Sequence, residues 1–302
     1  MSADKPLVSI VVPTYKRSDR IRVALDSIAA QDYGAENIEL IVVSDNRPEW
    51  PESAETDAAV APYAASLPHF RLLHTSGQTG GGAANNYACR QATGEYLTFL
   101  DDDDEFLPDK VSTQVAFMQE NSLDMSWQDV SWYDERGRLV EHRRLDHCED
   151  FSTEGLLRAH LLTPISPTAI YMLRRDLFDR TEGFGEVATG QDWWLMLRCI
   201  EAGAHMGYMP EVHVRQYLHS GERLSLGKNG EVARHEVVRG YYPRLSKKDV
   251  RYIEFRHNAV LAFAMKRSNQ PGQAVIYALK AIASSPAACV SEALKFFGKA
   301  KS

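Results

Sequence analysis

The sequence lacks several features that would place it in a membrane, nucleic-acid-binding or disulfide-stabilised class. It has no run of about 18 apolar residues, so no transmembrane helix is predicted. The formal charge is −7, whereas a nucleic-acid-binding protein would be expected to have a basic face, and we expect no such partner. Its four cysteines are far apart and have neither metal-binding nor redox spacing. With no signal-peptide pattern at the N-terminus, we expect a cytoplasmic protein.

The composition that remains is that of an ordinary globular protein. Hydrophobic residues make up 44% of the 302 residues and charged residues 25%. This length accommodates one large α/β domain with an appendage. We assign residues 1–228 to the α/β domain and residues 229–302 to a C-terminal helical extension. Helical patterns in that extension cover about 230–242, 246–267, 271–284 and 287–299.

Four apolar, β-prone segments alternate with helical patterns in the first hundred residues. The segments are 7–12, 39–43, 70–74 and 96–100. Continuous apolar runs of this length are typical of parallel strands that are covered on both faces. Alternation with helices predicts a Rossmann-like, doubly wound, mainly parallel sheet, and such sheets bind ligands beyond the carboxyl ends of their strands.

Polar or glycine-rich residues follow each of these strands. Pro13, Thr14 and Tyr15 follow the first strand, and Asp45 follows the second. A glycine run at 80–82 follows the third; it is either a phosphate-binding loop or a turn before a helix, and it fits neither the P-loop nor the dinucleotide fingerprint. Tyr15 could stack on a base or pack in the core, and Asp45 could contact a nucleotide or cap a turn.

The fourth strand ends in the acidic run Asp101, Asp102, Asp103, Asp104 and Glu105. One interpretation is a helix cap, because Asp is favoured at helix starts and Pro108 suits a first helical position. The other is a site in which carboxylates share a divalent cation with an anionic ligand such as a diphosphate. We expect the first half of the run to bind ligand and the second half to cap the next helix.

Two features of the later sequence could complete such a site. Asp192 lies at the start of a predicted helix and is followed by Trp193 and Trp194. It is either a helix cap or a general base that is separate from the metal-binding carboxylates. Because two adjacent tryptophans cannot both face the core, one of them could line a sugar pocket. His219 lies in a loop after a strand and would ordinarily be structural or solvated.

Together these residues resemble the inverting family 2 glycosyltransferases, which have the GT-A fold. The resemblance runs from about residue 8 to residue 225. Its pieces, in order, are 8–15, 41–45, Asn86 with 92–96, 99–104, 108–114, 183–184, 191–198, and His219 with Ser225.

The resemblance implies a role for each matching residue. Pro13, Thr14, Tyr15, Asp45, Asn86, Asp101, Asp102 and Trp193 would bind a nucleotide-sugar, most often a UDP-sugar. Asp103 and His219 would hold one Mn²⁺ or Mg²⁺, and Asp192 would deprotonate the acceptor hydroxyl. The acceptor would be a glycan or a lipid-linked glycan in polysaccharide assembly.

The sequence departs from the family pattern at three positions, and two rival functions stay open. Gln191 replaces an acid, Asn85 an arginine and Gly185 an aspartate. Gln191 and Asn85 favour, as one alternative, a sugar-nucleotide-binding protein that has lost catalysis. The other alternative is a nucleotidyl- or phosphoryl-transfer enzyme that uses the aspartates but needs no separate base.

The C-terminal helical patterns are amphipathic, and Lys295, Lys299 and Lys301 lie near the end. They are expected either to pack on the catalytic domain or a second subunit of a homo-oligomer, or to make a peripheral contact with the inner face of a membrane.

Overall fold

The computed structural model of the chain describes residues 5–185, 187, 189–218 and 228–299. The chain divides into two compact units. The first contains the described residues up to 160, those from 165 to 187 and those from 191 to 218. The second contains Leu161–Pro164, residues 189–190 and the C-terminal helices.

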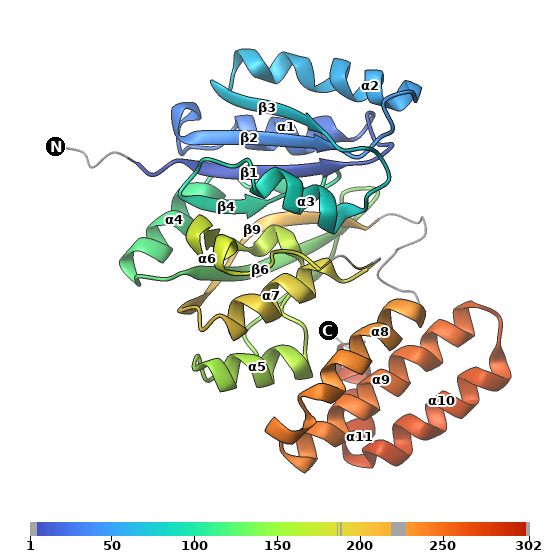
Figure 1. The fold of residues 1–302 in the computed structure, drawn as a ribbon. Helices are drawn as coiled ribbons and strands as arrows, with labels where there is room; N and C mark the ends of the chain where they lie inside the picture. The colour runs from blue at the N-terminus through green and yellow to red at the C-terminus, as the bar shows by residue number, and fades with distance from the viewer. Residues whose placement is uncertain (1–4, 186, 188, 219–227, 300–302) are drawn as a thin grey trace. The chain divides into compact units, whose positions relative to one another are not determined.

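Strands and helices alternate in the first half of the first unit (Figure 1). The strands are β1 (Val8–Thr14), β2 (Ile38–Ser44), β3 (His69–His74) and β4 (Tyr96–Phe99), and the helices between them are α1 (Ile21–Ala29), α2 (Pro51–Val60) and α3 (Gly81–Cys89). β1 pairs in parallel with both β2 and β4, and β2 pairs in parallel with β3. The doubly wound parallel arrangement predicted from the sequence is therefore confirmed.

Mixed strand pairing extends the sheet beyond β4. The added strands are β5 (Glu105–Phe106), β6 (Met125–Asp134), β7 (Leu139–Arg143), β8 (Met172–Arg174) and β9 (Met206–Leu218). The described strands run in the order β3-β2-β1-β4-β8-β6-β9-β5, and β7 pairs with β6. β8 is antiparallel to β4 and β6, whereas β9 is parallel to β6.

Burial explains why the N-terminal runs form strands. Every residue of β2 is buried, and β1 is buried apart from Pro13. α1 and α3 cover opposite faces of this part of the sheet (Figure 1). α1 buries Ile21, Leu25 and Ile28, which recur at helical spacing.

Four further helices of this unit are α4 (Lys110–Glu120), α5 (Thr153–Leu162), α6 (Arg175–Arg180) and α7 (Gln191–Glu201). α7 begins at Gln191, next to the helix start that the sequence predicted at Asp192. One expectation about the acidic run is wrong, however. Glu105 forms part of β5 and Asp104 bonds to β9, so these two side chains do not cap α4.

α4 begins with a lysine in the core. Lys110 is 0% exposed; its Nζ donates to the Thr98 hydroxyl and lies 4.2 Å from the centre of the Phe106 ring. Burial lowers the pKa of Lys110 well below its usual range. The folded protein therefore bears the cost of either desolvating the ammonium or releasing its proton.

We expect Lys110→Met to stabilise the fold by about 1–3 kcal/mol at pH 7, since methionine fills a similar volume without a polar group. Between the lowered folded pKa and the unfolded value near 10.4, the unfolded chain binds the extra proton, so wild-type stability rises with pH. The gain from Lys110→Met should therefore shrink towards pH 10. Thermal unfolding at pH 7 and pH 10 measures it, with exposed Lys248→Met as the control. A lower melting temperature for Lys110→Met at pH 7 would show that the contacts of the amine outweigh its burial.

The second unit consists mainly of α8 (Lys228–Gly240), α9 (Lys247–Arg267), α10 (Pro271–Ser284) and α11 (Pro286–Lys299). α9 begins at a regular cap, in which the Ser246 hydroxyl accepts a hydrogen bond from the Asp249 amide. Among the described residues, no single helix is long and apolar enough to cross a membrane. α10 and residues 286–292 of α11 satisfy that criterion only as a pair bent by 108°.

Candidate active site

The carboxyl ends of β1, β2, β3 and β4 lie at one edge of the sheet because these strands are parallel. This edge gathers residues that are far apart in the sequence. Pro13 and Thr14 end β1, Asp45 follows β2, and the run from Asp101 follows β4. The convergence of these residues, predicted from the strand pattern, is what the structure shows.

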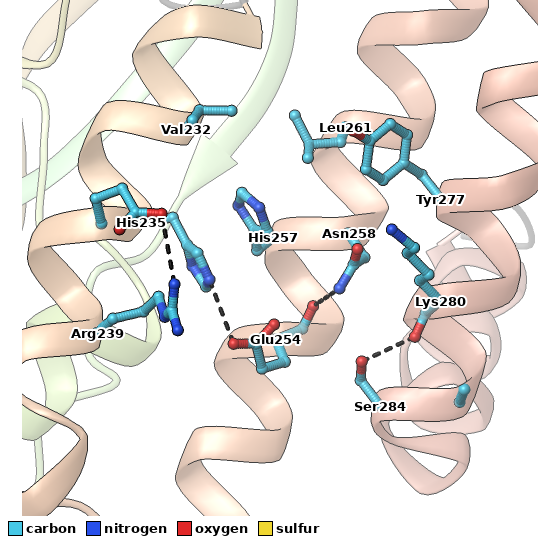
Figure 2. A pocket seen from close by; sticks show the side chains of 12 residues that line it. Val232, His235, Arg239, Glu254, His257, Asn258, Leu261, Tyr277, Lys280 and Ser284 are labelled. Atoms are coloured by element: carbon cyan, nitrogen blue, oxygen red, sulfur yellow. Dashed lines mark hydrogen bonds and ion pairs between the residues drawn. The ribbon is translucent and has the colours of Figure 1, made fainter.

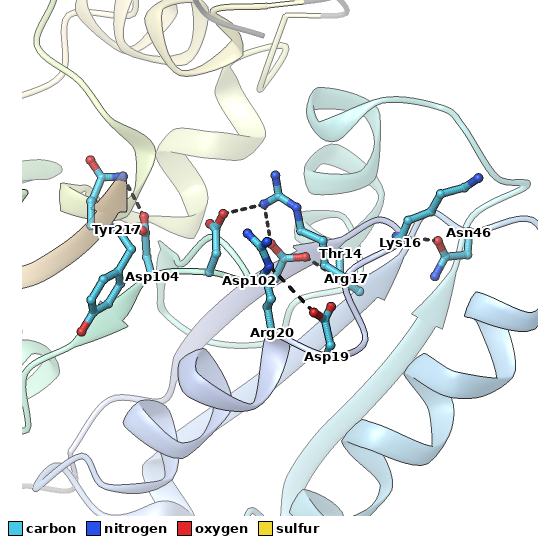
Figure 3. Close-up of polar contacts among 11 residues, drawn as sticks. Thr14, Lys16, Arg17, Asp19, Arg20, Asn46, Asp102, Asp104 and Tyr217 are labelled. Carbon is cyan, nitrogen blue, oxygen red and sulfur yellow. Dashed lines mark hydrogen bonds and ion pairs between the residues drawn. The ribbon is translucent and has the colours of Figure 1, made fainter. Parts of the chain in front are cut away.

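Asp102 connects the first strand end to the acidic run (Figure 3). One of its oxygens accepts a 2.7 Å hydrogen bond from the Thr14 hydroxyl, and the other accepts one of 3.0 Å from Arg17. Arg17 also pairs with Asp103 at 2.7 Å. Burial raises the pKa of Asp102 to about 6, although Arg17 and Thr14 oppose this shift. Sequence reasoning did not assign a role to Arg17, although a cation that follows β1 at the same sheet edge was a usable signal.

Asp101 connects the acidic run electrostatically to a distant carboxylate. Burial, with Asp103, Asp102 and Asp192 nearby, raises the pKa of Asp101 to about 7. Asp192 lies in the first turn of α7, about 90 residues further along the chain, and yet it contributes to this shift. The structure thus brings the two predicted carboxylate positions, the run after β4 and the start of α7, into one electrostatic environment.

Asp104 serves the fold instead. Its carboxylate accepts hydrogen bonds from Gln216 Nε2 at 2.7 Å and from the Tyr217 amide at 3.1 Å, both on β9. Burial and the neighbouring carboxylates Asp101 and Asp103 raise its pKa well above the usual range. The predicted metal ligand His219 lies outside the described residues, as does Ser225, and their roles stay predictions.

Asp45 organises the loop after β3. Its carboxylate accepts hydrogen bonds from both threonine hydroxyls, Thr75 and Thr79, and from two backbone amides, Thr79 at 3.0 Å and Gly80 at 2.9 Å. Asp45 is 5% exposed. The structure therefore gives Asp45 a turn-fixing role, which was one of the two interpretations of the sequence. Its contact with a nucleotide stays a prediction.

An aromatic pair lies beside this loop. Tyr15 is 38% exposed, and its hydroxyl accepts a hydrogen bond from Gln78 at 3.0 Å. Its ring centre lies 6.3 Å from that of Trp50, and Lys16 Nζ lies 3.8 Å from the Trp50 ring centre. These flat faces could stack on a base. Trp50 was missed from the sequence because it lies in a loop six residues after the end of β2, with no periodic pattern around it.

Asn86 holds a loop backbone in place. Its Nδ2 donates to the Phe184 carbonyl at 3.0 Å, and its Oδ1 accepts from the Phe184 amide at 2.8 Å. The glycine run permits this approach, because a Cβ on Gly82 would lie 2.5 Å from the Gly185 carbonyl oxygen. The run is thus a close-packed helix start against the 183–185 loop. Contact of Asn86 with a nucleotide-sugar stays a prediction.

One tryptophan of the pair faces the core and the other does not, as expected, but the one in the core is Trp193. Trp193 is 3% exposed and stacks on His160, with ring centres 5.4 Å apart. Trp194 is partly exposed and meets Trp193 edge-on. Trp193 is therefore a core residue, which contradicts the sugar contact predicted for it, whereas Trp194 reaches the surface.

The carboxylates are suitable ligands for a divalent cation. Among the described residues, no group of three His, Cys, Asp or Glu side chains is arranged to hold a metal ion. Mg²⁺, however, is usually bound through one or two carboxylates, with substrate phosphates and water completing the shell. Burial and the neighbouring carboxylates raise the pKa of Asp101, and a bound cation would favour its ionised form. Asp101 and Asp103 therefore fit the role.

We expect Asp101→Asn to stabilise the metal-free protein while abolishing donor binding. The substitution removes one like charge from a crowded site, with a gain of about 1–2 kcal/mol at pH 8. Because the folded pKa near 7 exceeds the unfolded one, the cost of the charge is present above pH 7 and disappears as the pH falls towards 4. Melting temperatures at pH 8 and pH 5 check this, with exposed Asp19→Asn as the control. A gain that is equal at both pH values would contradict the charge argument.

A separate cleft of about 720 Å³ lies in the helical unit, between α8, α9 and α10 (Figure 2). Its wall contains two stacked imidazoles, His235 and His257, with ring centres 3.7 Å apart. Burial and His257 lower the pKa of His235, although Glu254 partly offsets this shift. α10 contributes Tyr277 and Lys280, so one side of that helix faces this polar cleft.

Sequence comparison relates this chain to known glycosyltransferases. The family model for glycosyl transferase family 2 matches residues 9–181, which is more than half of the chain. An uncharacterized glycosyltransferase from Rickettsia bellii is 31% identical over 194 residues, covering 60% of this chain and 26% of that protein. A Methanocaldococcus jannaschii glycosyltransferase is 24% identical over 199 residues, covering 65% and 66%. The chain thus spans only about a quarter of the length of the Rickettsia relative.

Solved structures with the same fold include two glycosyltransferases. Residues 1–349 of TarS from S. aureus, in complex with UDP-GlcNAc, give a TM-score of 0.60 at 18% identity over 90% of each chain. The mannosyltransferase PcManGT from Pyrobaculum calidifontis, in complex with GDP-Man and Mn²⁺, gives 0.61 at 20% identity over 97% of this chain and 80% of that one. These likenesses confirm the predicted GT-A fold. With the family match over residues 9–181, they show that the chain belongs to glycosyl transferase family 2.

Proposed function

We propose that this protein transfers a sugar from a nucleotide-diphosphate sugar to an acceptor hydroxyl, with inversion at the anomeric carbon. The main observation in its favour is that Asp192 lies near the carboxylates after β4. It is close enough to raise the pKa of Asp101. A diphosphate bound at the acidic run after β4 and an acceptor hydroxyl bound at Asp192 would then share one site.

In the proposed reaction Asp192 accepts the proton of the acceptor hydroxyl. The hydroxyl oxygen forms a bond to the anomeric carbon while the bond from that carbon to the diphosphate oxygen breaks. The nucleoside diphosphate leaves from the opposite face, which inverts the configuration. Asp192 lies in the first turn of α7, where the free amides and dipole of the helix end interact favourably with negative charge.

Asp101 and Asp103 are the residues that would hold Mn²⁺ or Mg²⁺, with His219 as a proposed further ligand. A cation bound there would stabilise the charge that develops on the leaving diphosphate. Arg17, which pairs with Asp102 and Asp103, is positioned to contribute further positive charge. On the nucleoside side, Tyr15 and Trp50 supply aromatic faces beside the loop that Asp45 fixes.

We favour a UDP-sugar as the donor, in line with the resemblance of the sequence and with the UDP-GlcNAc complex of TarS. The GDP-Man complex of PcManGT makes GDP-sugars the next candidates. For the acceptor we propose a glycan or lipid-linked glycan of a surface polysaccharide. An Escherichia coli relative, 33% identical over 117 residues, is provisionally named for colanic acid biosynthesis. We place the reaction on the cytoplasmic side, with a peripheral membrane contact through the C-terminal helices.

Thermal-shift screening of nucleotide-sugars with and without Mn²⁺ tests the donor site. A donor at 100 times its dissociation constant should stabilise the fold by about 2.7 kcal/mol, which is several degrees in melting temperature. We expect the shift to need both donor and Mn²⁺. Product analysis with the best donor then tests transfer and the anomeric configuration.

The rival functions give different results in the same experiments. Donor stabilisation without transfer or donor hydrolysis, across a panel of acceptors, would support the binding protein. Release of pyrophosphate from a nucleoside triphosphate would support nucleotidyl transfer. A product that retains the donor configuration would contradict the inverting mechanism.

A further inference from the structure

The charges of this chain are strongly segregated. Residues 266–302 contain six lysines and arginines and a single acid, Glu292, whereas residues 1–265 contain 28 basic and 40 acidic side chains. Residues 266–302 are thus a basic segment of an otherwise acidic chain. Basic segments of this kind are attracted to surfaces of anionic lipid.

α10 presents aliphatic side chains to solvent. Val275, Ile276, Leu279 and Ile282 are 58%, 54%, 61% and 46% exposed. At 100° per residue these four positions fall on one face, and the buried Ala281 lies on the opposite face. Lys280 is the only charged residue of α10 and lies at the border of the aliphatic face. The polar side of the helix, with Tyr277 and Ser284, lines the cleft of Figure 2.

The next helix adds to this exposed apolar surface. In α11, Val290 and Leu294 are 61% and 67% exposed and are four residues apart, so they share one face. α10 has 14 residues, about 21 Å of helix, which is shorter than the roughly 30 Å hydrocarbon core of a bilayer. The 108° bend before α11 also prevents the two helices from forming one straight span. This geometry suits helices that lie along a membrane surface.

We propose that the aliphatic face of α10 (Val275, Ile276, Leu279 and Ile282), together with Val290 and Leu294, rests in the headgroup region of a membrane that contains anionic lipids. A face without acids, in a segment that holds six basic residues and one acid, is complementary to such a surface. Only the purpose of this membrane contact, which is access to a lipid-linked acceptor, rests on the proposed function.

Flotation of the full chain with vesicles tests this surface without either substrate. We expect binding to vesicles of phosphatidylglycerol and phosphatidylcholine, weaker binding to phosphatidylcholine alone, and release by high salt. Leu279→Glu should weaken partitioning at least tenfold, because it places a charge in the aliphatic face. The matched control is Gln273→Glu, which makes the same charge on the polar side of α10 and should weaken it about twofold at most. Both positions are exposed, so both variants should unfold at the wild-type temperature.

Three results would overturn the proposal. They are no binding to either vesicle, equal binding by Leu279→Glu and wild type, and a dimer in light scattering that Leu279→Glu dissociates. The last would assign the face to a second copy of the chain. Transfer to a soluble acceptor, measured in parallel, should be unchanged in Leu279→Glu. A protein that binds vesicles but transfers nothing would sink the proposed reaction and leave the membrane surface intact.

Discussion

Asp192→Asn is expected to lower sugar transfer by about 10²–10⁴-fold, the usual contribution of a general base, while donor affinity stays within about twofold of wild type. Asparagine keeps the size and hydrogen-bonding capacity of the side chain but cannot take a proton. It also removes a negative charge near Asp101, so donor binding should not weaken. The loss should therefore appear in kcat and not in KM for the donor.

The control for Asp192→Asn is Asp176→Asn in α6. Asp176 is likewise an acid in the first turn of a helix, and its side chain is 63% exposed in an ion pair with Arg174. Both variants lose the favourable charge at a helix start, which is worth about 0.3–1 kcal/mol. Only Asp192→Asn should lose activity. If its donor affinity fell as far as its turnover, Asp192 would be a donor-binding residue and not the base.

The parts of the site that the sequence predicts are those that follow from strand order alone. Continuous apolar runs identify strands with two covered faces, and parallel strands end at one edge. That reasoning places Asp45 and Asp101 together without any knowledge of side-chain packing. The helix after the glycine run follows from periodicity in the same way.

The contacts that the sequence does not predict join elements with no local relation. Asp104 bonds to β9, more than 100 residues away, and no pattern around it distinguishes it from Asp103. Arg17 reaches Asp102 from a loop. For the tryptophan pair, however, a signal was present. Trp193, Met196, Leu197 and Ile200 recur at helical spacing and are all buried, so periodicity assigns Trp193 to the core.

Asp103→Asn is expected to abolish the Mn²⁺-dependent thermal shift by the donor and to lower transfer by about 10²–10³-fold, the cost of losing one group that stabilises developing charge. In the structure Asp103 pairs with Arg17 at 2.7 Å, so its carboxylate already faces a positive charge. Asparagine would weaken both this pair and a metal–oxygen bond, because its amide oxygen carries no net charge.

Titration of Mn²⁺ by calorimetry, in the presence of the nucleoside diphosphate, measures this effect directly. Asp19→Asn is the control; its side chain is 79% exposed and pairs only loosely with Arg20, at 3.9 Å. Comparison of this result with that for Asp192→Asn separates the role of the acidic run after β4 from the role of Asp192. Loss of metal and donor binding in Asp103→Asn, with loss of turnover alone in Asp192→Asn, is the pattern that a metal-dependent transfer with a separate base requires. Retention of Mn²⁺-dependent donor binding in Asp103→Asn would instead assign the cation to Asp101 and leave Asp103 as the partner of Arg17.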